Sequence, residues 1–435
     1  MEASLVGLLG IVVLLAILLF TGMPVGFAMA LVGFLGMSCV IPVKAAMATL
    51  GTDLWQTFSS YGLTVIPLFI LMGEITFYSG VSERLYNAAY KWVGQIRGGV
   101  AMATVMACAG FAAICGSNTA TAATMSTVAL PEMKKYRYNP ILSTGAVASG
   151  STLGVVIPPS VVLIVVGLYT GQSIGRLFFG GVIPGLVLTG LFIFTIYVLC
   201  SVKKDWGPPG PKTTFLEKLK ALPGAIEMIV LFLLVMGGLY MGWFTPSEAG
   251  AAGAFCAIVV SLVRRTLTWE KFLAAVTDTL KLSCMIFVIV TGAVIFGRFL
   301  TVTRLPYETA KWAASLPIPH VVILAIVLVI YIIGGAVMDA LAFLLVTIPI
   351  FYPVIMAMGY DPIWYGVLIT VITTMGAVTP PVGVNTYVVA GVAKDVPLGS
   401  IFKGVTFFLP AYVICAIFMI LFPDLVLFLP RLLRG

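Results

Sequence analysis

The chain has 435 residues, of which 61% are hydrophobic and only 9% are charged, and its formal net charge is +8. An ordinary soluble domain is roughly 45–50% apolar and about 25% charged, so this composition excludes a soluble globular protein. The basic residues lie between apolar segments and form no stripe interleaved with stacking aromatic side chains, which argues against a nucleic-acid partner. The sequence therefore predicts an all-α polytopic membrane protein in a lipid bilayer.

Apolar runs separated by charged residues, glycine or proline predict ten membrane crossings, because about 20 apolar residues in a helix cross the hydrocarbon core. The first run is expected to be retained, since Met1-Glu2-Ala3 lacks the basic start of a signal peptide. The segment from Ile41 to Ser60 is expected to be the longest outward loop. The predicted crossings are 4–21, 23–41, 61–80, 140–170, 176–201, 223–243, 246–263, 282–302, 362–392 and 404–422.

Two further apolar stretches, 98–133 and 318–357, are too long for one crossing. A straight helix of about 35 residues would be some 50 Å long, well beyond the roughly 30 Å hydrocarbon core. Basic residues precede and follow the first stretch, so both its ends are expected on the cytoplasmic side. We expect a re-entrant hairpin with its tip at Gly116-Ser117-Asn118-Thr119, and a second hairpin broken at Gly334-Gly335, with Asp339 just beyond.

Five crossings and one hairpin in each half place 17 of the 24 Lys and Arg residues on the cytoplasmic side and the N-terminus outside. Residues 203–222 are predicted to be a cytoplasmic linker. This segment contains Pro208-Pro209-Gly210-Pro211 and a short amphipathic face with Phe215, Leu216 and Leu219. The first half is residues 1–202 and the second is residues 223–435.

A motif with two consecutive prolines occurs once in each half. Gly154-Val-Val-Ile-Pro-Pro159 has a counterpart 222 residues later in Gly376-Ala-Val-Thr-Pro-Pro381. Consecutive prolines remove two backbone donors, so the helices 140–170 and 362–392 are expected to unwind there and leave carbonyl oxygens free for a cation. Because each half has an odd number of crossings, the second copy is expected to be inverted, which is the architecture of secondary transporters.

These motifs resemble one family over nearly the full length. Gly116-Ser-Asn-Thr-Ala-Thr-Ala, Ser149-Gly-Ser-Thr-Leu-Gly-Val-Val-Ile-Pro-Pro-Ser160, Met338-Asp-Ala and Thr374-Met-Gly-Ala-Val-Thr-Pro-Pro-Val-Gly383 are similar to the large membrane subunit of tripartite ATP-independent periplasmic (TRAP) transporters. The tip also resembles the divalent anion:sodium symporters. The resemblance implies an elevator mechanism, in which a transport domain slides against a scaffold domain.

The resemblance further implies two sodium sites. Because the sequence has no Walker A motif, we expect no use of ATP, and we expect no organic cofactor. Each site would lie between a hairpin tip and the following Pro-Pro break. The first would use Ser117, Asn118 and carbonyl groups around Gly150, Gly154 and Val156. The second would use the tip from Gly334 to Asp339, including Gly335, together with Gly376, Thr379 and Pro380; this tip has no Ser-Asn-Thr, so its ligands follow less directly from the family pattern.

Several polar residues within apolar segments are candidates for binding substrate, because such residues are costly in a membrane unless paired or functional. Arg298 could bind a carboxylate with its planar fork or could be an interfacial anchor. The residues assigned to the substrate are Thr119, Ser151, Thr152, Arg298 and Asn385. Tip residues could also cap helices, and Asp339 could be an N-cap or a salt-bridge partner. Glu74 could join a charge network or a proton relay, or could only pack near a helix end.

The leading hypothesis is a sodium-coupled importer of a small organic acid in the bacterial inner membrane. The resemblance implies two partners, a small membrane subunit and a periplasmic substrate-binding protein. A stand-alone sodium/dicarboxylate symporter is the closest alternative. An intramembrane serine protease is disfavoured because His320 is the only histidine, and a channel is disfavoured because broken helices replace a repeated pore-lining face.

Overall fold

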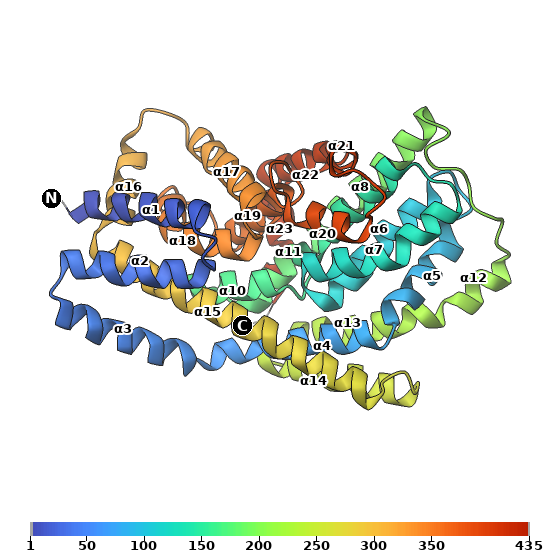
Figure 1. Cartoon of the computed structure of the whole chain (residues 1–435), viewed down its shortest axis with the longest axis horizontal. Helices are drawn as coiled ribbons and strands as arrows, with labels where there is room; N and C mark the ends of the chain where they lie inside the picture. The colour runs from blue at the N-terminus through green and yellow to red at the C-terminus, as the bar shows by residue number, and fades with distance from the viewer. Residues whose placement is uncertain (1–2, 434–435) are drawn as a thin grey trace.

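The computed structural model describes residues 3–433, and within this range all regular secondary structure is helical (Figure 1). The helices are α1 (Ala3–Phe20), α2 (Val25–Val40), α3 (Val43–Phe58), the 3-10 helix η1 (Tyr61–Thr64), α4 (Val65–Tyr78), α5 (Val81–Val93), α6 (Gly99–Cys115), α7 (Asn118–Lys135), α8 (Pro140–Ser151), α9 (Leu153–Val156), α10 (Val161–Thr170), α11 (Ile174–Val202), α12 (Phe215–Ala221), α13 (Pro223–Tyr240), α14 (Pro246–Val263), α15 (Trp269–Val302), α16 (Leu305–Ser315), α17 (His320–Val337), α18 (Ala340–Ala357), α19 (Pro362–Gly376), α20 (Val384–Val392), α21 (Leu398–Thr406), α22 (Leu409–Leu421) and α23 (Pro423–Leu432).

The polytopic all-α prediction agrees with this structure. Within residues 3–433, ten helical segments are long and apolar enough to cross a bilayer. They are not the ten predicted crossings one for one, since both α17 and α18 are among them and α2 and α19 are shorter. The predicted hairpin stretches each form a pair of helices joined by two residues, α6 with α7 and α17 with α18.

Four sequence expectations are wrong in detail. Residues 43–58 form the helix α3 where a loop was expected, because polar residues within this segment are as compatible with an amphipathic helix as with a loop. The helix α15 begins at Trp269, thirteen residues before the predicted crossing, since Thr268 caps it and accepts a hydrogen bond from the Lys271 amide. The last crossing consists of two helices, α21 and α22, and a further helix, α23, follows.

The fourth correction concerns the second hairpin. The pair Gly334-Gly335 does not interrupt the helix. Both residues lie within α17, which continues to Val337. The turn is made by Met338, which is extended at φ −124° and ψ 161°, and by Asp339. The Asp339 carboxylate accepts a hydrogen bond from the Leu341 amide (3.0 Å), so a side-chain cap and not a glycine sets the tip.

The first hairpin turns at a glycine in a left-handed conformation. Gly116 adopts a left-handed conformation with φ +62° at the end of α6, which a residue with a Cβ adopts only under strain. Ser117 then caps α7, and its hydroxyl accepts from the Ala120 amide (3.4 Å). Two residues therefore suffice to reverse the chain between buried helices.

The Pro-Pro motifs interrupt their helices as predicted. In the first half, α9 ends at Val156 and α10 begins after Ser160, whose hydroxyl accepts from the Leu163 amide. In the second half, α19 ends at Gly376 and α20 begins after Gly383, which has φ +60°. Each helix pair is thus followed by a broken helix, and this order occurs twice along the chain.

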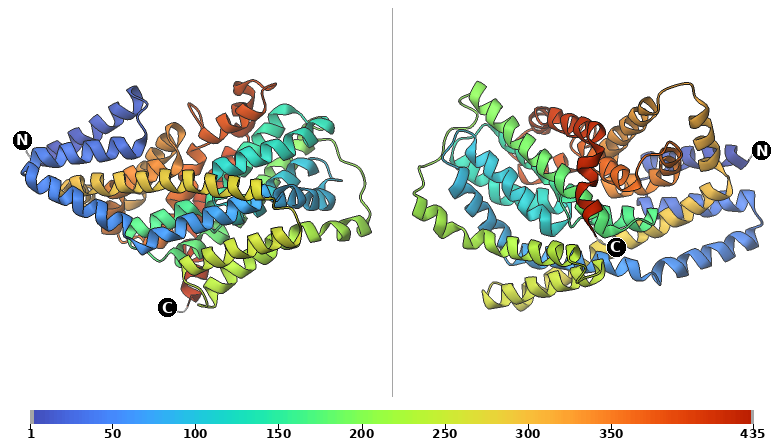
Figure 2. Two further views of the ribbon diagram at one scale, coloured as in Figure 1. Left: turned by 60° about the horizontal axis from the view of Figure 1, so that its bottom comes forward. Right: turned by 180° about the vertical axis from the view of Figure 1, so that it is seen from behind.

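The long helix α15 forms the centre of a group that contains α14 and the N-terminal helices α2, α3 and α4. It packs along α2 and also contacts α3 and α4, while α14 packs on α4 (Figures 1 and 2). Glycines allow close approach here: a Cβ at Gly33 would lie 2.9 Å from the Phe296 backbone. The helix pairs and broken helices lie beside this group, and α4 and α15 contact both.

Candidate functional site

The tip of the first hairpin lies directly against the first break. A Cβ at Gly154 would be 2.5 Å from the carbonyl oxygen of Ser117, so only glycine permits this approach. The Val161 amide, just after the prolines, donates to the Gly116 carbonyl (3.4 Å). The tip and the break that the sequence predicted to be partners are therefore in contact.

The second tip and break are also in contact, through a different set of bonds. The amides of Val382 and Gly383 both donate to the carbonyl of Ala336 (3.1 and 3.0 Å), near the end of α17. The two glycines Gly335 and Gly376 cross closely, since a Cβ at Gly376 would lie 2.7 Å from the Gly335 Cα. Gly335 and Gly376 thus serve helix packing at this contact.

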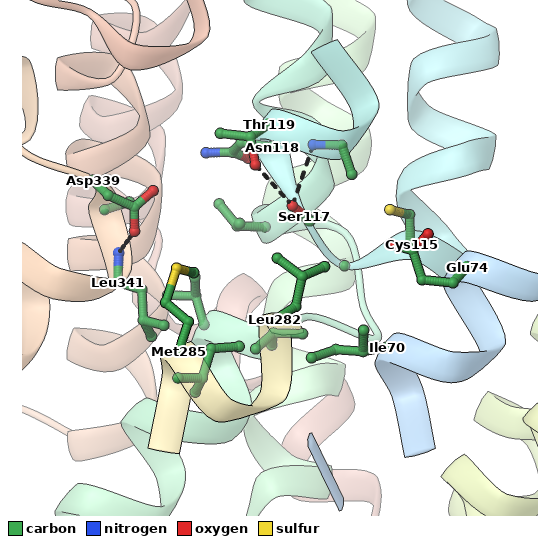
Figure 3. Close-up of a pocket in the computed structure, with 17 residues that line it drawn as sticks. Ile70, Glu74, Cys115, Ser117, Asn118, Thr119, Leu282, Met285, Asp339 and Leu341 are labelled. Carbon is green, nitrogen blue, oxygen red and sulfur yellow. Dashed lines mark hydrogen bonds between the residues drawn. The ribbon is translucent and has the colours of Figure 1, made fainter. Parts of the chain in front are cut away.

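A small cavity of about 90 Å³ lies between the two tips and the α4–α15 wall (Figure 3). The first tip contributes Ser117, Asn118 and Thr119, and the second contributes Asp339. The wall opposite them consists of residues from α4, including Glu74, and apolar residues of α15. The cavity therefore lies between the two predicted sodium regions and faces α4 and α15.

Polar groups in the cavity are only partly satisfied. The hydroxyl groups of Ser117 and Thr119 lie 3.3 Å apart. Asn118 is buried, with 5% of its surface exposed, and its Oδ1 has no hydrogen-bond partner within the described structure. A buried carbonyl oxygen without a donor is costly, and a cation would satisfy it. The groups available to bind a cation at this tip are a side-chain carbonyl, hydroxyls and backbone carbonyls. Hard cations prefer such oxygen ligands.

The helices α7 and α18 both begin at this cavity, and each has 18 residues. The first amides of α7 carry partial positive charge, which favours an anionic group of a ligand, whereas the start of α18 is already capped by the Asp339 carboxylate. The structure therefore places an anion-attracting helix start and a cation-attracting amide oxygen around one space.

Three of the predicted substrate residues lie elsewhere, in the packed core between the halves. Asn385 of α20 donates through Nδ2 to the Ser151 hydroxyl at the end of α8 (3.0 Å), and both side chains are at most 1% exposed. Thr152 lies 2.5 Å from the hydroxyl of Tyr412. The first bond joins the two broken helices and the second joins the first broken helix to α22, and none of the three residues lines the cavity.

Arg298 is also outside the cavity. Its guanidinium donates to both carboxylate oxygens of Asp53 in α3, through Nη2 (2.9 Å) and Nε (3.3 Å). Asp53 is 2% exposed, whereas the Arg298 side chain is 46% exposed. Sequence reasoning missed Asp53, although an acidic residue beside apolar segments was an available signal.

The remaining predicted ligands differ in position. Gly150 packs on Cys108, where an added Cβ would lie 3.2 Å from the Cys108 sulfur, and the carbonyl oxygen of Val156 lies against Gly181 of α11. Thr379 donates its hydroxyl to the Met375 carbonyl (2.6 Å), which caps the end of α19. Pro380 is exposed. The first tip therefore carries the more enclosed of the two candidate cation regions.

Residues 12–425 match the family described as "Tripartite ATP-independent periplasmic transporter, DctM component". The chain belongs to this family. Its members are permease subunits of transporters, and the chain is therefore a multi-pass membrane transport protein and not an enzyme. The TRAP resemblance stated from the tip and break motifs is confirmed.

Two relatives and one solved structure give the extent of the likeness. The chain is 35% identical over 377 residues to the C4-dicarboxylate TRAP transporter large permease protein DctM of Pseudomonas aeruginosa, covering 86% of this chain and 87% of the relative. It is 34% identical over 385 residues to the isethionate TRAP transporter permease protein DctMQ of Oleidesulfovibrio alaskensis, covering 87% of this chain and 59% of that protein. The YdaH transporter of Alcanivorax borkumensis has a similar fold, with a TM-score of 0.61 and 15% identity over 97% of this chain and 99% of that one.

Proposed function

We propose that this TRAP large permease subunit imports a small organic acid in symport with sodium across the bacterial inner membrane. The unpartnered, buried Oδ1 of Asn118 at the first tip carries this proposal, because it requires a cation or a donor. The contact of each tip with the following break supports it, since it brings several backbone carbonyl oxygen atoms together in each region. Relatives named for a C4-dicarboxylate and for isethionate favour a small organic anion as substrate.

The two proposed sodium sites keep the residues expected from the family. The first comprises Ser117 and Asn118 with carbonyl groups around Gly150, Gly154 and Val156. The second comprises Gly335, Asp339, Gly376, Thr379 and Pro380. Bound sodium would supply positive charge beside the cavity, and would thereby favour binding of an acid next to it. Sodium bound with the substrate couples uptake to the sodium gradient.

The proposed movement is an elevator. The helix pairs and broken helices would form the transport domain, related as inverted repeats, and the group around α15 would form the scaffold. The cavity lies at the boundary between these two groups, because it is lined by both tips and by α4 and α15. Motion of the tips past α15 would move the cavity from one side of the membrane to the other.

A small membrane subunit and a periplasmic substrate-binding protein are the proposed partners. The relative named DctMQ is longer than this chain, which covers 59% of it. An experiment that tests the assembly is uptake into liposomes with an inward sodium gradient, with and without the two partners. Uptake only with both partners present would support the tripartite arrangement, whereas robust uptake by the purified chain alone would favour a stand-alone symporter.

A further inference from the structure

The charged residues of the cavity are acidic only. Glu74 and Asp339 line it, and no Lys, Arg or His is among its described lining residues. Figure 3 shows the two acids on opposite sides of the turn from Ser117 to Thr119. The arginine that the sequence predicts to bind substrate, Arg298, is bound to Asp53 away from this cavity. A dianionic substrate would therefore meet two carboxylates and no basic side chain.

Glu74 has no basic partner within the described structure. Its neighbour along the wall, Asp278, accepts a hydrogen bond from Tyr78 (2.6 Å) and forms an ion pair with Lys281 (3.2 Å). Gly73 packs against the backbone of Cys115, where an added Cβ would lie 3.0 Å from the Cys115 Cα, so Glu74 is held beside the first tip. This half-buried carboxylate favours a positively charged group in the cavity.

The other groups around the cavity match an anion and a metal cation. The amide-bearing start of α7 suits a substrate carboxylate, since the start of α18 is already capped by Asp339, and the buried Asn118 Oδ1 without a donor suits sodium. Asp339 lies at the second proposed sodium region. With sodium at the second region balancing Asp339, and sodium on neutral ligands at the first tip balancing the substrate carboxylate, the charge of Glu74 is left for a second group of the substrate to balance.

We propose that the organic acid carried by this chain is a zwitterion, whose carboxylate faces the start of α7 and whose ammonium group pairs with Glu74. This inference rests on the proposed function and narrows its substrate class. Glu74 lies on α4, a wall that the tips would pass in the proposed movement. Glu74 would then determine which substrates are accepted, because a dicarboxylate would place its second negative charge where the ammonium group lies.

The test uses matched small molecules on the purified full-length chain in detergent. β-Alanine, propionate and succinate each have a carboxylate at one end. At the other end, β-alanine has an ammonium group, propionate has a methyl group and succinate has a second carboxylate. The series 4-aminobutyrate, butyrate and glutarate repeats the comparison with one more methylene. Thermal stabilisation is measured for each compound at saturating sodium, and sodium alone is titrated first.

For the amino acid that binds better, we expect half-maximal stabilisation at a concentration about tenfold lower than for the dicarboxylate of the same series. The amino acid gains an ion pair with Glu74 and avoids the repulsion between Glu74 and a second carboxylate. Glu74→Gln should remove this preference and leave the sodium titration unchanged. Glu270→Gln, an exposed acid at the start of α15, is the matched control and should keep the preference.

Three outcomes would overturn the inference. They are equal or better stabilisation by the dicarboxylates, an undiminished amino-acid preference in Glu74→Gln, or a loss of sodium affinity in that variant, which would make Glu74 a sodium ligand. A chain that sodium itself does not stabilise would instead contradict the proposed function. The two failures are therefore distinguishable.

Discussion

At the scale of single residues, Asn118 offers the most direct test of the proposed cation site at the first tip. Its side chain is buried and its Oδ1 lacks a partner, so removal of the amide should cost sodium affinity and little packing. Asn118→Ala should raise the sodium concentration for half-maximal uptake by about tenfold, equivalent to one lost ligand contact of about 1.4 kcal/mol. Asn87→Ala, at an exposed position on α5, is the control. An unchanged sodium dependence at normal expression would count against the first site.

The pair Arg298–Asp53 has the opposite character, because both its members have a partner. We propose that it fixes α3 to α15. Arg298→Ala leaves a buried carboxylate without a counter-charge, whereas Asp53→Ala leaves an arginine that is 46% exposed and can reach water. The melting temperature should therefore fall more in Arg298→Ala, by an amount equivalent to about 2 kcal/mol. The double variant should be more stable than Arg298→Ala; equal losses in both single variants would contradict this assignment.

At the scale of elements, the contact of tip and break depends on Gly154. Its added Cβ would lie 2.5 Å from the Ser117 carbonyl oxygen, so Gly154→Ala must displace the first tip. We expect sodium-driven uptake to fall by about tenfold or more, since each 1.4 kcal/mol of lost binding energy is a factor of ten. Gly190→Ala, in α11, is the control because nothing lies within 4 Å of its added Cβ. Wild-type uptake by Gly154→Ala would mean that the contact is not needed.

The sequence predicted the helix pairs and the broken helices because local chemistry determines them. About 35 apolar residues must turn, and two consecutive prolines must end a helix. The position of the second turn was wrong, since glycine within a tightly packed helix cannot be distinguished locally from glycine at a turn. Gly335 is needed for its approach to Gly376, 41 positions later, which no local pattern reveals.

The site was predicted less completely than the fold, for a related reason. Polar residues within apolar segments were assigned to the substrate because no partner was evident near them in the sequence. In the structure, their partners come from distant segments. Asn385 meets Ser151 across 234 residues, and Arg298 meets Asp53 across 245. The Ser-Asn-Thr tip was found because its residues are contiguous, and the structure places all three on the cavity.

At the scale of the whole molecule, the arrangement predicts that both ends of the first helix pair lie on one side of the membrane. Single cysteines at positions 97 and 134, before α6 and near the end of α7, should both react with an impermeant reagent from the cytoplasm. The background chain should lack its exposed cysteines, Cys39 and Cys284. Labelling of the two positions from opposite sides would remove the hairpin, and with it the proposed inverted repeat.

Sodium coupling is the claim on which the transport cycle depends, and the most direct measurement is a sodium titration of the purified chain. The melting temperature is followed as sodium chloride replaces potassium chloride at constant ionic strength. Ligand binding to the folded state stabilises it by about 2.7 kcal/mol at a hundred times the dissociation constant, so the melting temperature should rise with sodium and level off. Superimposable curves in sodium and potassium would contradict sodium binding at the tips.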